Sequence, residues 1–136
     1  MMVLSSDGEV FSWGVGEGGC LGREGEPSTP TLVPNLPGDM ARLVCGPKCS
    51  GVIDPLGKLL VVGENSSNRL GLDGERGRVG SSLVFKEAPR EVGTVGEVSL
   101  GLNFSLVLNT RGEVWRLGGE KRGVMRIWSG KEMVMR

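Results

Sequence analysis

Three glycines near the N-terminus have the spacing of a dinucleotide-binding loop. Gly14, Gly16 and Gly19 form the pattern G-x-G-x-x-G. In nucleotide-binding proteins this loop follows a strand and leads into a helix whose N-terminal amides bind the pyrophosphate. An alternating, strand-like stretch precedes Gly14, but residues 20–27, with the sequence CLGREGEP, cannot begin a helix of useful length. The pattern gives weak support for a nucleotide site, and we predict no cofactor.

The other reactive side chains do not combine into a catalytic or metal-binding set. Cys45 and Cys49 are four residues apart, Cys20 is distant, and the chain has no histidine. A structural zinc usually needs four cysteine or histidine ligands, and a nucleophilic serine or cysteine needs a neighbouring base. Glu24 and Glu26 lie in a polar stretch typical of solvated carboxylates. We predict no catalytic residue and no metal, and expect the cysteines to be buried in strands.

The overall composition restricts the partners and the compartment. Sixteen basic and sixteen acidic residues give a net charge of zero, which argues against nucleic acid as a partner. Residues 111–136 nevertheless carry seven basic and three acidic residues. No apolar run approaches the roughly 18 residues of a membrane span, and no signal peptide is visible. With only three cysteines, we expect an intracellular protein, cytoplasmic or nuclear, that does not enter a membrane.

The glycines form an internal repeat. Residues 6–14, 55–63 and 110–118 each contain two glycines six residues apart, at successive offsets of 49 and 55 residues. Leu21-Gly22 recurs as Leu70-Gly71 with the first offset, and Gly46 recurs as Gly101 with the second. The positions that define the repeat are Gly8, Trp13, Gly14, Leu21, Gly22, Gly46, Gly57, Gly63, Leu70, Gly71, Gly101, Gly112 and Gly118.

Each copy has the pattern of a β-hairpin. Short segments rich in β-forming residues flank turns at residues 5–8, 54–57 and 109–112, where Asp, Asn, Pro and Gly favour tight turns. A further strand is expected before each later copy, and residues 73–93 are expected to be a long, charged loop. The predicted strands are 2–4, 9–13, 40–44, 51–53, 59–62, 95–100, 105–108, 113–117 and 125–128.

A repeat of about 50 residues made of short antiparallel strands is typical of a β-propeller blade. The sequence SDGEVFSWG at residues 6–14, followed by Leu21-Gly22, resembles the regulator of chromosome condensation repeat. The resemblance covers about residues 2–118 and implies that Trp13 packs between blades. It is imperfect, because Cys49 and Phe104 stand where that family usually has histidine.

We therefore predict an all-β fold, a partial β-propeller of about two to three blades of the four-stranded type, in a single domain spanning residues 1–136. The repeat copies are expected at about residues 1–45, 46–100 and 101–136. The family's ring has about seven blades, and the predicted number here is smaller, so three explanations stay open. The chain is a fragment of a longer protein, which we prefer, or several copies complete a ring, or it folds alone with covered ends.

The predicted function is that of a non-enzymatic module that binds protein partners through loops on a rigid scaffold. The resemblance implies one alternative, guanine-nucleotide exchange on a small Ras-like GTPase, although no residue here matches a site for that activity. A second alternative is chromatin or nucleic-acid contact through the basic residues of 111–136.

Overall fold

The structure is a computed structural model that describes residues 1–14, 19–74 and 77–129. These residues form antiparallel sheets and short 3-10 turns, with no α-helix among them. The all-β prediction is confirmed.

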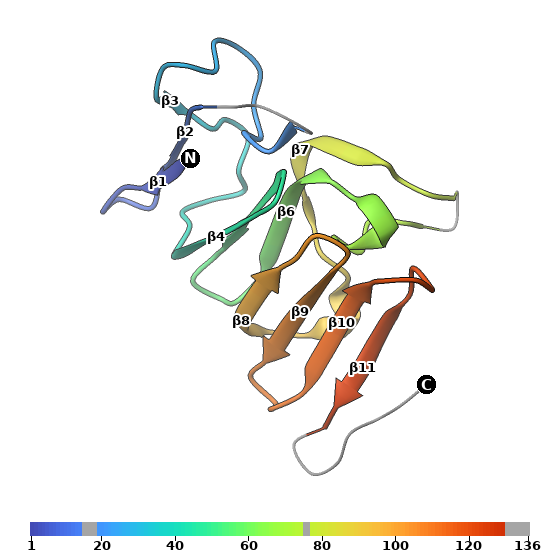
Figure 1. Cartoon of the computed structure of the whole chain (residues 1–136). Coiled ribbons are helices and arrows are strands. Elements are labelled where there is room, and N and C mark those ends of the chain that lie inside the picture. Colours follow the sequence, from blue (N-terminus) through green and yellow to red (C-terminus); the bar gives the residue numbers. More distant parts are fainter. Residues whose placement is uncertain (15–18, 75–76, 130–136) are drawn as a thin grey trace.

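The described strands form three sheets that follow one another along the chain (Figure 1). Sheet 1 has the order β1-β2-β3, sheet 2 the order β4-β5-β6-β7 and sheet 3 the order β11-β10-β9-β8. Sheet 1 contains β1 (Met2–Leu4), β2 (Val10–Ser12) and β3 (Thr31–Leu32). Sheet 2 contains β4 (Arg42–Gly46), β5 (Cys49–Ile53), β6 (Leu59–Glu64) and β7 (Ser81–Glu87). Sheet 3 contains β8 (Val95–Leu100), β9 (Phe104–Asn109), β10 (Val114–Gly118) and β11 (Val124–Trp128). The 3-10 turns are η2 (Ser66–Asn68) and η3 (Arg90–Val92).

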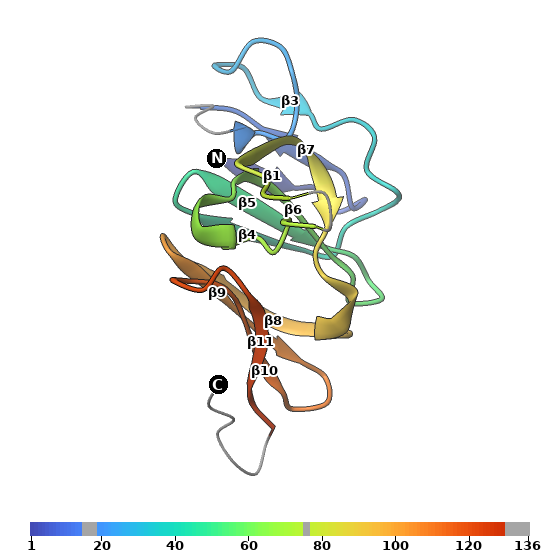
Figure 2. The same cartoon turned by 90° about the vertical axis from the view of Figure 1, so that its right-hand side faces the viewer.

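The sheets are stacked face to face as three layers, with sheet 2 in the middle (Figure 2). The first strands of neighbouring sheets lie against each other, since β1 contacts β4 and β4 contacts β8. One apolar cluster fills the space between sheets 1 and 2, and includes Met2, Val10, Val52 and Leu60. A larger cluster lies between sheets 2 and 3. Each layer is therefore a blade, and the blades are held together by two separate cores.

Sheet 2 is buried on both faces because its side chains alternate between the two cores. In β5, Ile53 belongs to the core shared with sheet 3, whereas Val52 belongs to the core shared with sheet 1. In β6, Val61 and Leu60 divide in the same way. The two-residue side-chain period of a strand thus explains why these runs are continuously apolar.

The three hairpin turns use the same polar contact. The first residue of each turn accepts hydrogen bonds from the backbone N–H groups two and four residues later. Ser5 Oγ accepts at 3.3 and 3.1 Å, Asp54 Oδ1 at 2.9 and 2.8 Å, and Asn109 Oδ1 at 3.0 Å twice. These residues are separated by the repeat offsets of 49 and 55. The short polar side chains at the turn positions therefore fix the geometry of each hairpin.

A glycine in the first two turns allows each blade to approach the next. At Gly8, with φ +84°, an added Cβ would lie 2.5 Å from Asp39 Cβ, and at Gly57, with φ +87°, 2.4 Å from Thr94 Cγ2. The Gly8 carbonyl group accepts a hydrogen bond of 2.8 Å from the Met40 N–H group. The Gly57 carbonyl group accepts one of the same length from the Val95 N–H group. Gly112, the equivalent glycine of sheet 3, has no described atom within 4 Å of its Cβ position. Among the described residues, the turn glycine of sheet 3 therefore contacts no following blade.

Several strand predictions agree closely with the structure, and one loop prediction is wrong. Residues 2–4 and 95–100 are β1 and β8. Residues 73–93, expected to be a loop, contain β7 and η3. β7 lacks an alternating pattern because it is the outer strand of sheet 2 and exposes both Leu83 and Val84.

Two packing predictions also need correction. Trp13 is half-buried and belongs to neither core, because its side of sheet 1 faces away from sheet 2. Of the cysteines, Cys49 is buried but Cys45 is exposed and Cys20 only half-buried, and no disulfide joins them. The division into copies at residues 46 and 101 stays a prediction. Those boundaries fall near the β4–β5 and β8–β9 turns, within a sheet.

Candidate interaction surface

The described residues contain no group of three or more His, Cys, Asp or Glu side chains that could hold a metal ion. Gly16 of the glycine pattern lies outside the described residues. Around it, β2 precedes Gly14, and the described residues from Gly19 to Pro30 form turns and bends without an α-helix. Glu26 accepts hydrogen bonds from the N–H and hydroxyl groups of Ser28, which lower the pKa of its carboxyl group. That carboxylate stabilises its own loop.

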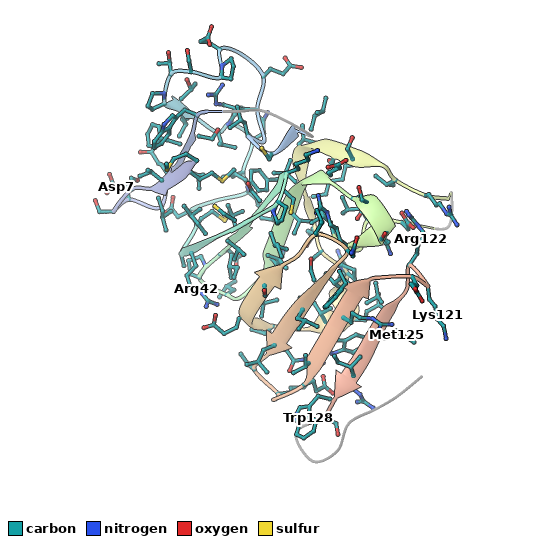
Figure 3. The ribbon with its side chains drawn as sticks, in the orientation of Figure 1. Asp7, Arg42, Lys121, Arg122, Met125 and Trp128 are labelled. Atoms are coloured by element: carbon teal, nitrogen blue, oxygen red, sulfur yellow. The ribbon has the colours of Figure 1, made fainter. Side chains whose placement is uncertain are left out.

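The turns at residues 5–8, 54–57 and 109–112 lie along one edge of the stack, which we call the hairpin-turn edge. Figure 3 labels Asp7 in the first of these turns, at the tip beyond β1 and β2. Leu56, in the second turn, is the most exposed large apolar side chain described, at 84%. The Leu56 N–H donates to Asp54 Oδ1, and Gly57 has the positive φ that the turn requires. An apolar side chain is thus presented to solvent on a rigid turn.

Two depressions flank Leu56. One, of about 350 Å³, lies between the β5–β6 turn and the segment around η3. The other, of about 400 Å³, lies between the same turn and the segment that leads into β4. The first is lined by residues 56–59, 87–90 and 92–95, and the second by residues 37–40, 54–56 and 58. An exposed apolar side chain beside such hollows is a suitable centre for a protein contact.

Charged side chains border the larger depression. Lys58 Nζ lies 3.1 Å from Glu87 Oε1, and Arg90 Nη2 lies 3.8 Å from Glu87 Oε2. The hydrogen bond and the charge of Lys58 lower the pKa of the Glu87 carboxyl group. The rim therefore carries both signs of charge, and Lys58 favours the ionised form of Glu87.

The third turn of the hairpin-turn edge holds a more tightly connected carboxylate. Glu113 Oε1 accepts from Asn109 Nδ2 and Arg111 Nη2, each at 2.8 Å, and Glu113 Oε2 accepts from Arg126 Nη1 at 3.0 Å. These bonds lower the pKa of the Glu113 carboxyl group to about 2, with the hydrogen bond from Asn109 as the largest cause. The carboxylate neutralises two of the basic side chains that could have formed a polyanion-binding patch.

On the opposite edge, a polar network joins sheet 2 to sheet 3. Arg122 Nε and Nη2 donate to the two carboxylate oxygens of Asp73 at 2.8 and 3.0 Å, which lowers the pKa of Asp73. The Arg122 carbonyl accepts from Asn68 Nδ2, and buried Asn65 donates to Asn68 and Asp73. Figure 3 shows Arg122 in the β10–β11 turn, beside the segment that contains η2. This network connects two blades and has no arrangement suited to catalysis.

Most of the predicted repeat positions lie where two segments of the chain pack closely together, and they do not gather around a ligand site. Leu21 and Leu70 are buried at 5% and 0% exposure. An added Cβ would clash with a neighbouring segment at most of the glycines, for example at 2.5 Å from Leu100 Cβ for Gly46 and at 2.6 Å from Pro89 Cγ for Gly71. Similar close contacts surround Gly8, Gly22, Gly57, Gly63, Gly101 and Gly118, whereas Gly14 and Gly112 have none closer than 3.8 Å.

Sequence reasoning missed Leu56 and the Asp73–Arg122 pair. The sequence predicts only a turn at Leu56, although a leucine between Pro55 and Gly57 is an available signal of an exposed apolar residue. No sequence signal links Asp73 to Arg122, because they are 49 residues apart and meet only through the stacking of the sheets.

Stacked antiparallel blades of three or four strands, joined through equivalent turns, define the class of the protein as a repeat-built β-propeller fold. Residues 7–53 match the regulator of chromosome condensation (RCC1) repeat. This match covers the first copy of the repeat, and it confirms the resemblance to this family that the sequence indicates.

Curated relatives share the same segment. The serine/threonine-protein kinase Nek8 of Danio rerio is 28% identical over 138 aligned positions, which cover 90% of this chain and 20% of the kinase. The protein RCC2 homolog of Xenopus laevis is 24% identical over 127 positions, covering 90% of this chain and 24% of that protein. The chain therefore spans about a fifth to a quarter of the length of these relatives, and the kinase name assigns no activity to it.

Solved structures show the same fold. Human WBSCR16 superposes with a TM-score of 0.71 at 22% identity, over 86% of this chain and 30% of that one. Prp20p from Saccharomyces cerevisiae superposes with a TM-score of 0.70 at 17% identity, also over 86% and 30%. The partial β-propeller prediction is confirmed.

Proposed function

We propose that this chain is a non-enzymatic module that binds a protein partner through its hairpin-turn edge. The observation that carries the proposal is Leu56, an exposed apolar side chain held on a rigid turn between two depressions. The charged rim of Lys58, Glu87 and Arg90 would orient the partner. The partner class that fits is a folded protein or peptide with an apolar residue bordered by both signs of charge.

The absence of a catalytic arrangement in the described residues is consistent with this role but does not define it. No disulfide joins the three cysteines. We include an intracellular location, cytoplasmic or nuclear, in the proposal because three cysteines among 136 residues are few for a secreted protein stabilised by disulfides. Among the described residues, no helix has the length and apolarity needed to cross a membrane.

Affinity capture with a matched variant tests the proposal. Tagged wild-type chain, Leu56→Lys and Leu83→Lys would be used to capture proteins from lysate, with quantification by mass spectrometry. We expect at least one partner to fall by about tenfold or more with Leu56→Lys, as for the loss of a central apolar contact. The same partner should be retained by Leu83→Lys, because Leu83 lies on β7, away from that edge, and is 64% exposed. Equal recovery with all three proteins would contradict the proposed surface.

A second candidate function is guanine-nucleotide exchange on a small Ras-like GTPase. Its support is the likeness to Prp20p, whose structure is described together with its binding properties to Gsp1p and histones. We rank it second because only 30% of that chain is covered. Release of a fluorescent guanine nucleotide from the GTPase tests it, and an unchanged release rate at saturating chain would remove it.

Chromatin contact through the basic residues of 111–136 is less well supported. Within the described part of that segment, Arg111 and Arg126 pair with Glu113, and Arg122 pairs with Asp73. Cations already paired with carboxylates release fewer counterions when they meet a polyanion.

A further inference from the structure

Sheets 1 and 3 each have one face that the described residues do not cover with another sheet. In sheet 3 this face carries Phe104, Leu106, Leu108 and Val114, which we call the sheet 3 flank. In sheet 1 it carries Val3, Phe11 and Trp13, the sheet 1 flank. Both flanks are predominantly apolar at the centre of a β-sheet, where a soluble protein normally presents polar side chains.

The repeat shows what the sheet 3 flank is built to contact. Each of its residues has a structural equivalent 55 positions earlier in sheet 2, and all of these equivalents are buried against sheet 3. The equivalents of Phe104 and Leu108 are Cys49 and Ile53, which are 1% and 2% exposed, whereas Phe104 and Leu108 are 46% and 39% exposed. The sheet 3 flank therefore has the residue pattern of a blade face that receives the next blade.

The sheet 1 flank has the complementary pattern. Its residues are equivalent, with the offset of 49, to Val52, Leu60 and Val62 of sheet 2, the face with which sheet 2 contacts the preceding blade. Val52 and Leu60 belong to the core shared with sheet 1 and are 0% and 5% exposed, whereas Val3 is 45% exposed. The sheet 3 flank thus has the residue pattern of a face that contacts a following blade. The sheet 1 flank has the pattern of a face that contacts a preceding blade.

The sheet 3 flank also has room and an unsatisfied donor for a partner. A depression of about 750 Å³ opens beside it and is lined by Phe104, Leu106, Arg116 and Ile127, among others. Arg116 Nε is buried without a hydrogen-bond partner in the described residues. Large side chains such as Phe11 and Trp13 on an incoming sheet would fill this space, and an acceptor on that sheet would satisfy the guanidinium group.

We propose that the sheet 3 flank of one copy binds the sheet 1 flank of a second copy. The association is head-to-tail, because the two contacting surfaces differ, and it repeats the packing already present at the two internal junctions. Such heterologous contacts extend into rings or open filaments rather than closed two-fold dimers. This inference is independent of the proposed partner on the hairpin-turn edge, and either can fail without the other.

Mixing two complementary variants tests this arrangement. Leu108→Lys places a charge on the sheet 3 flank opposite exposed Glu97, and Val3→Lys places one on the sheet 1 flank. Val84→Lys on β7 is the matched control, because Val84 is 57% exposed but lies on neither flank. Sedimentation equilibrium of the full chain over a wide concentration range gives the mass, and circular dichroism checks that each variant keeps the wild-type fold. Phe104→Ser replaces Leu108→Lys if the latter unfolds.

The mass of wild-type chain and of Val84→Lys should rise with concentration. Leu108→Lys and Val3→Lys should each weaken association by about tenfold or more. Their equimolar mixture should form a one-to-one dimer that does not extend, because only one intact receiving face and one intact partner face are present. A wild-type chain that stays monomeric would overturn the proposal. So would association of Val3→Lys as strong as that of wild type, because it would indicate contact between identical surfaces.

Discussion

Glu113 lies where three donors from two strands and a turn converge. Its carboxylate accepts from Asn109, Arg111 and Arg126, and its side chain is 14% exposed. Because the charged form is favoured in the folded state, the pKa falls from 4.5 to about 2. Protonation of this carboxylate at low pH would therefore weaken its contacts within sheet 3.

The pH dependence of stability should show this effect. Since the folded-state pKa of Glu113 is lowered, the ionised carboxylate stabilises the fold above about pH 4.5, and this contribution is lost as the pH falls toward 2. Glu113→Gln should therefore flatten the decline in the free energy of unfolding between these pH values, measured by urea titration. Glu120→Gln, a change at an exposed residue of the β10–β11 turn, should follow the wild-type curve. Parallel curves for wild type and Glu113→Gln would contradict the assignment.

The unit of construction at the scale of elements is the hairpin with its turn glycine. Gly57 and Gly112 have nearly the same backbone conformation, with φ +87° and +80°. They differ in surroundings, since Thr94 Cγ2 would lie 2.4 Å from a Cβ at position 57, and nothing described lies within 4 Å at position 112. This pair separates the cost of backbone strain from the cost of disturbing a junction between blades.

Alanine at the two positions should therefore have unequal effects. Gly112→Ala should lower the free energy of unfolding by about 1–2 kcal/mol, the cost of a left-handed conformation for a residue with a Cβ. Gly57→Ala should lower it by about 1–3 kcal/mol more, because the sheet 2–sheet 3 junction must also move. Chemical denaturation of both variants measures the difference. Equal losses would show that the contact between Gly57 and Thr94 is not a tight one.

Much of the element structure was predictable because turn chemistry is local. Ser5, Asp54 and Asn109 at turn starts, with glycines three residues later, specify the hairpins without tertiary information. The β7 strand was missed because its sequence, SSLVFKE, does not alternate and its pairing to β6 contains an irregularity between Val61 and Gly63. β7 forms by pairing with β6 at the edge of sheet 2, and no local sequence pattern indicates that pairing.

The candidate site was less predictable than the fold. The presence of Leu56 in a turn does not by itself predict a binding surface. The depressions beside Leu56 exist because segments far apart in the chain, residues 37–40 and 87–95, meet around one hairpin. The repeat offsets did predict which positions are equivalent. The exposure that distinguishes the two end flanks from the interior faces required the structure.

At the scale of the whole molecule, the blades are joined by apolar cores and by polar contacts, of which the Asp73–Arg122 ion pair is one. Asp73 belongs to the segment between β6 and β7, and Arg122 to the β10–β11 turn, so their ion pair connects sheets 2 and 3. Both side chains are largely buried, at 18% and 23% exposure. The bidentate geometry makes this pair a specific contact between blades.

A double-mutant cycle measures that contact. Asp73→Asn, Arg122→Ala and the double variant should give a coupling free energy of about 0.5–1 kcal/mol in urea unfolding, the upper part of the range for partly exposed pairs. The coupling should shrink in high salt, because screening weakens the pair. Additive effects of the two changes would mean that this ion pair does not stabilise the junction between the blades.

The central functional claim is that the hairpin-turn edge is the surface that meets a partner. The most direct measurement is hydrogen–deuterium exchange of the chain with and without a protein captured by it. We predict that the partner slows exchange in residues 55–58 and 88–94, which border the larger depression beside Leu56. Slowed exchange confined to residues 64–73 and 118–123, on the opposite edge, would contradict the claim.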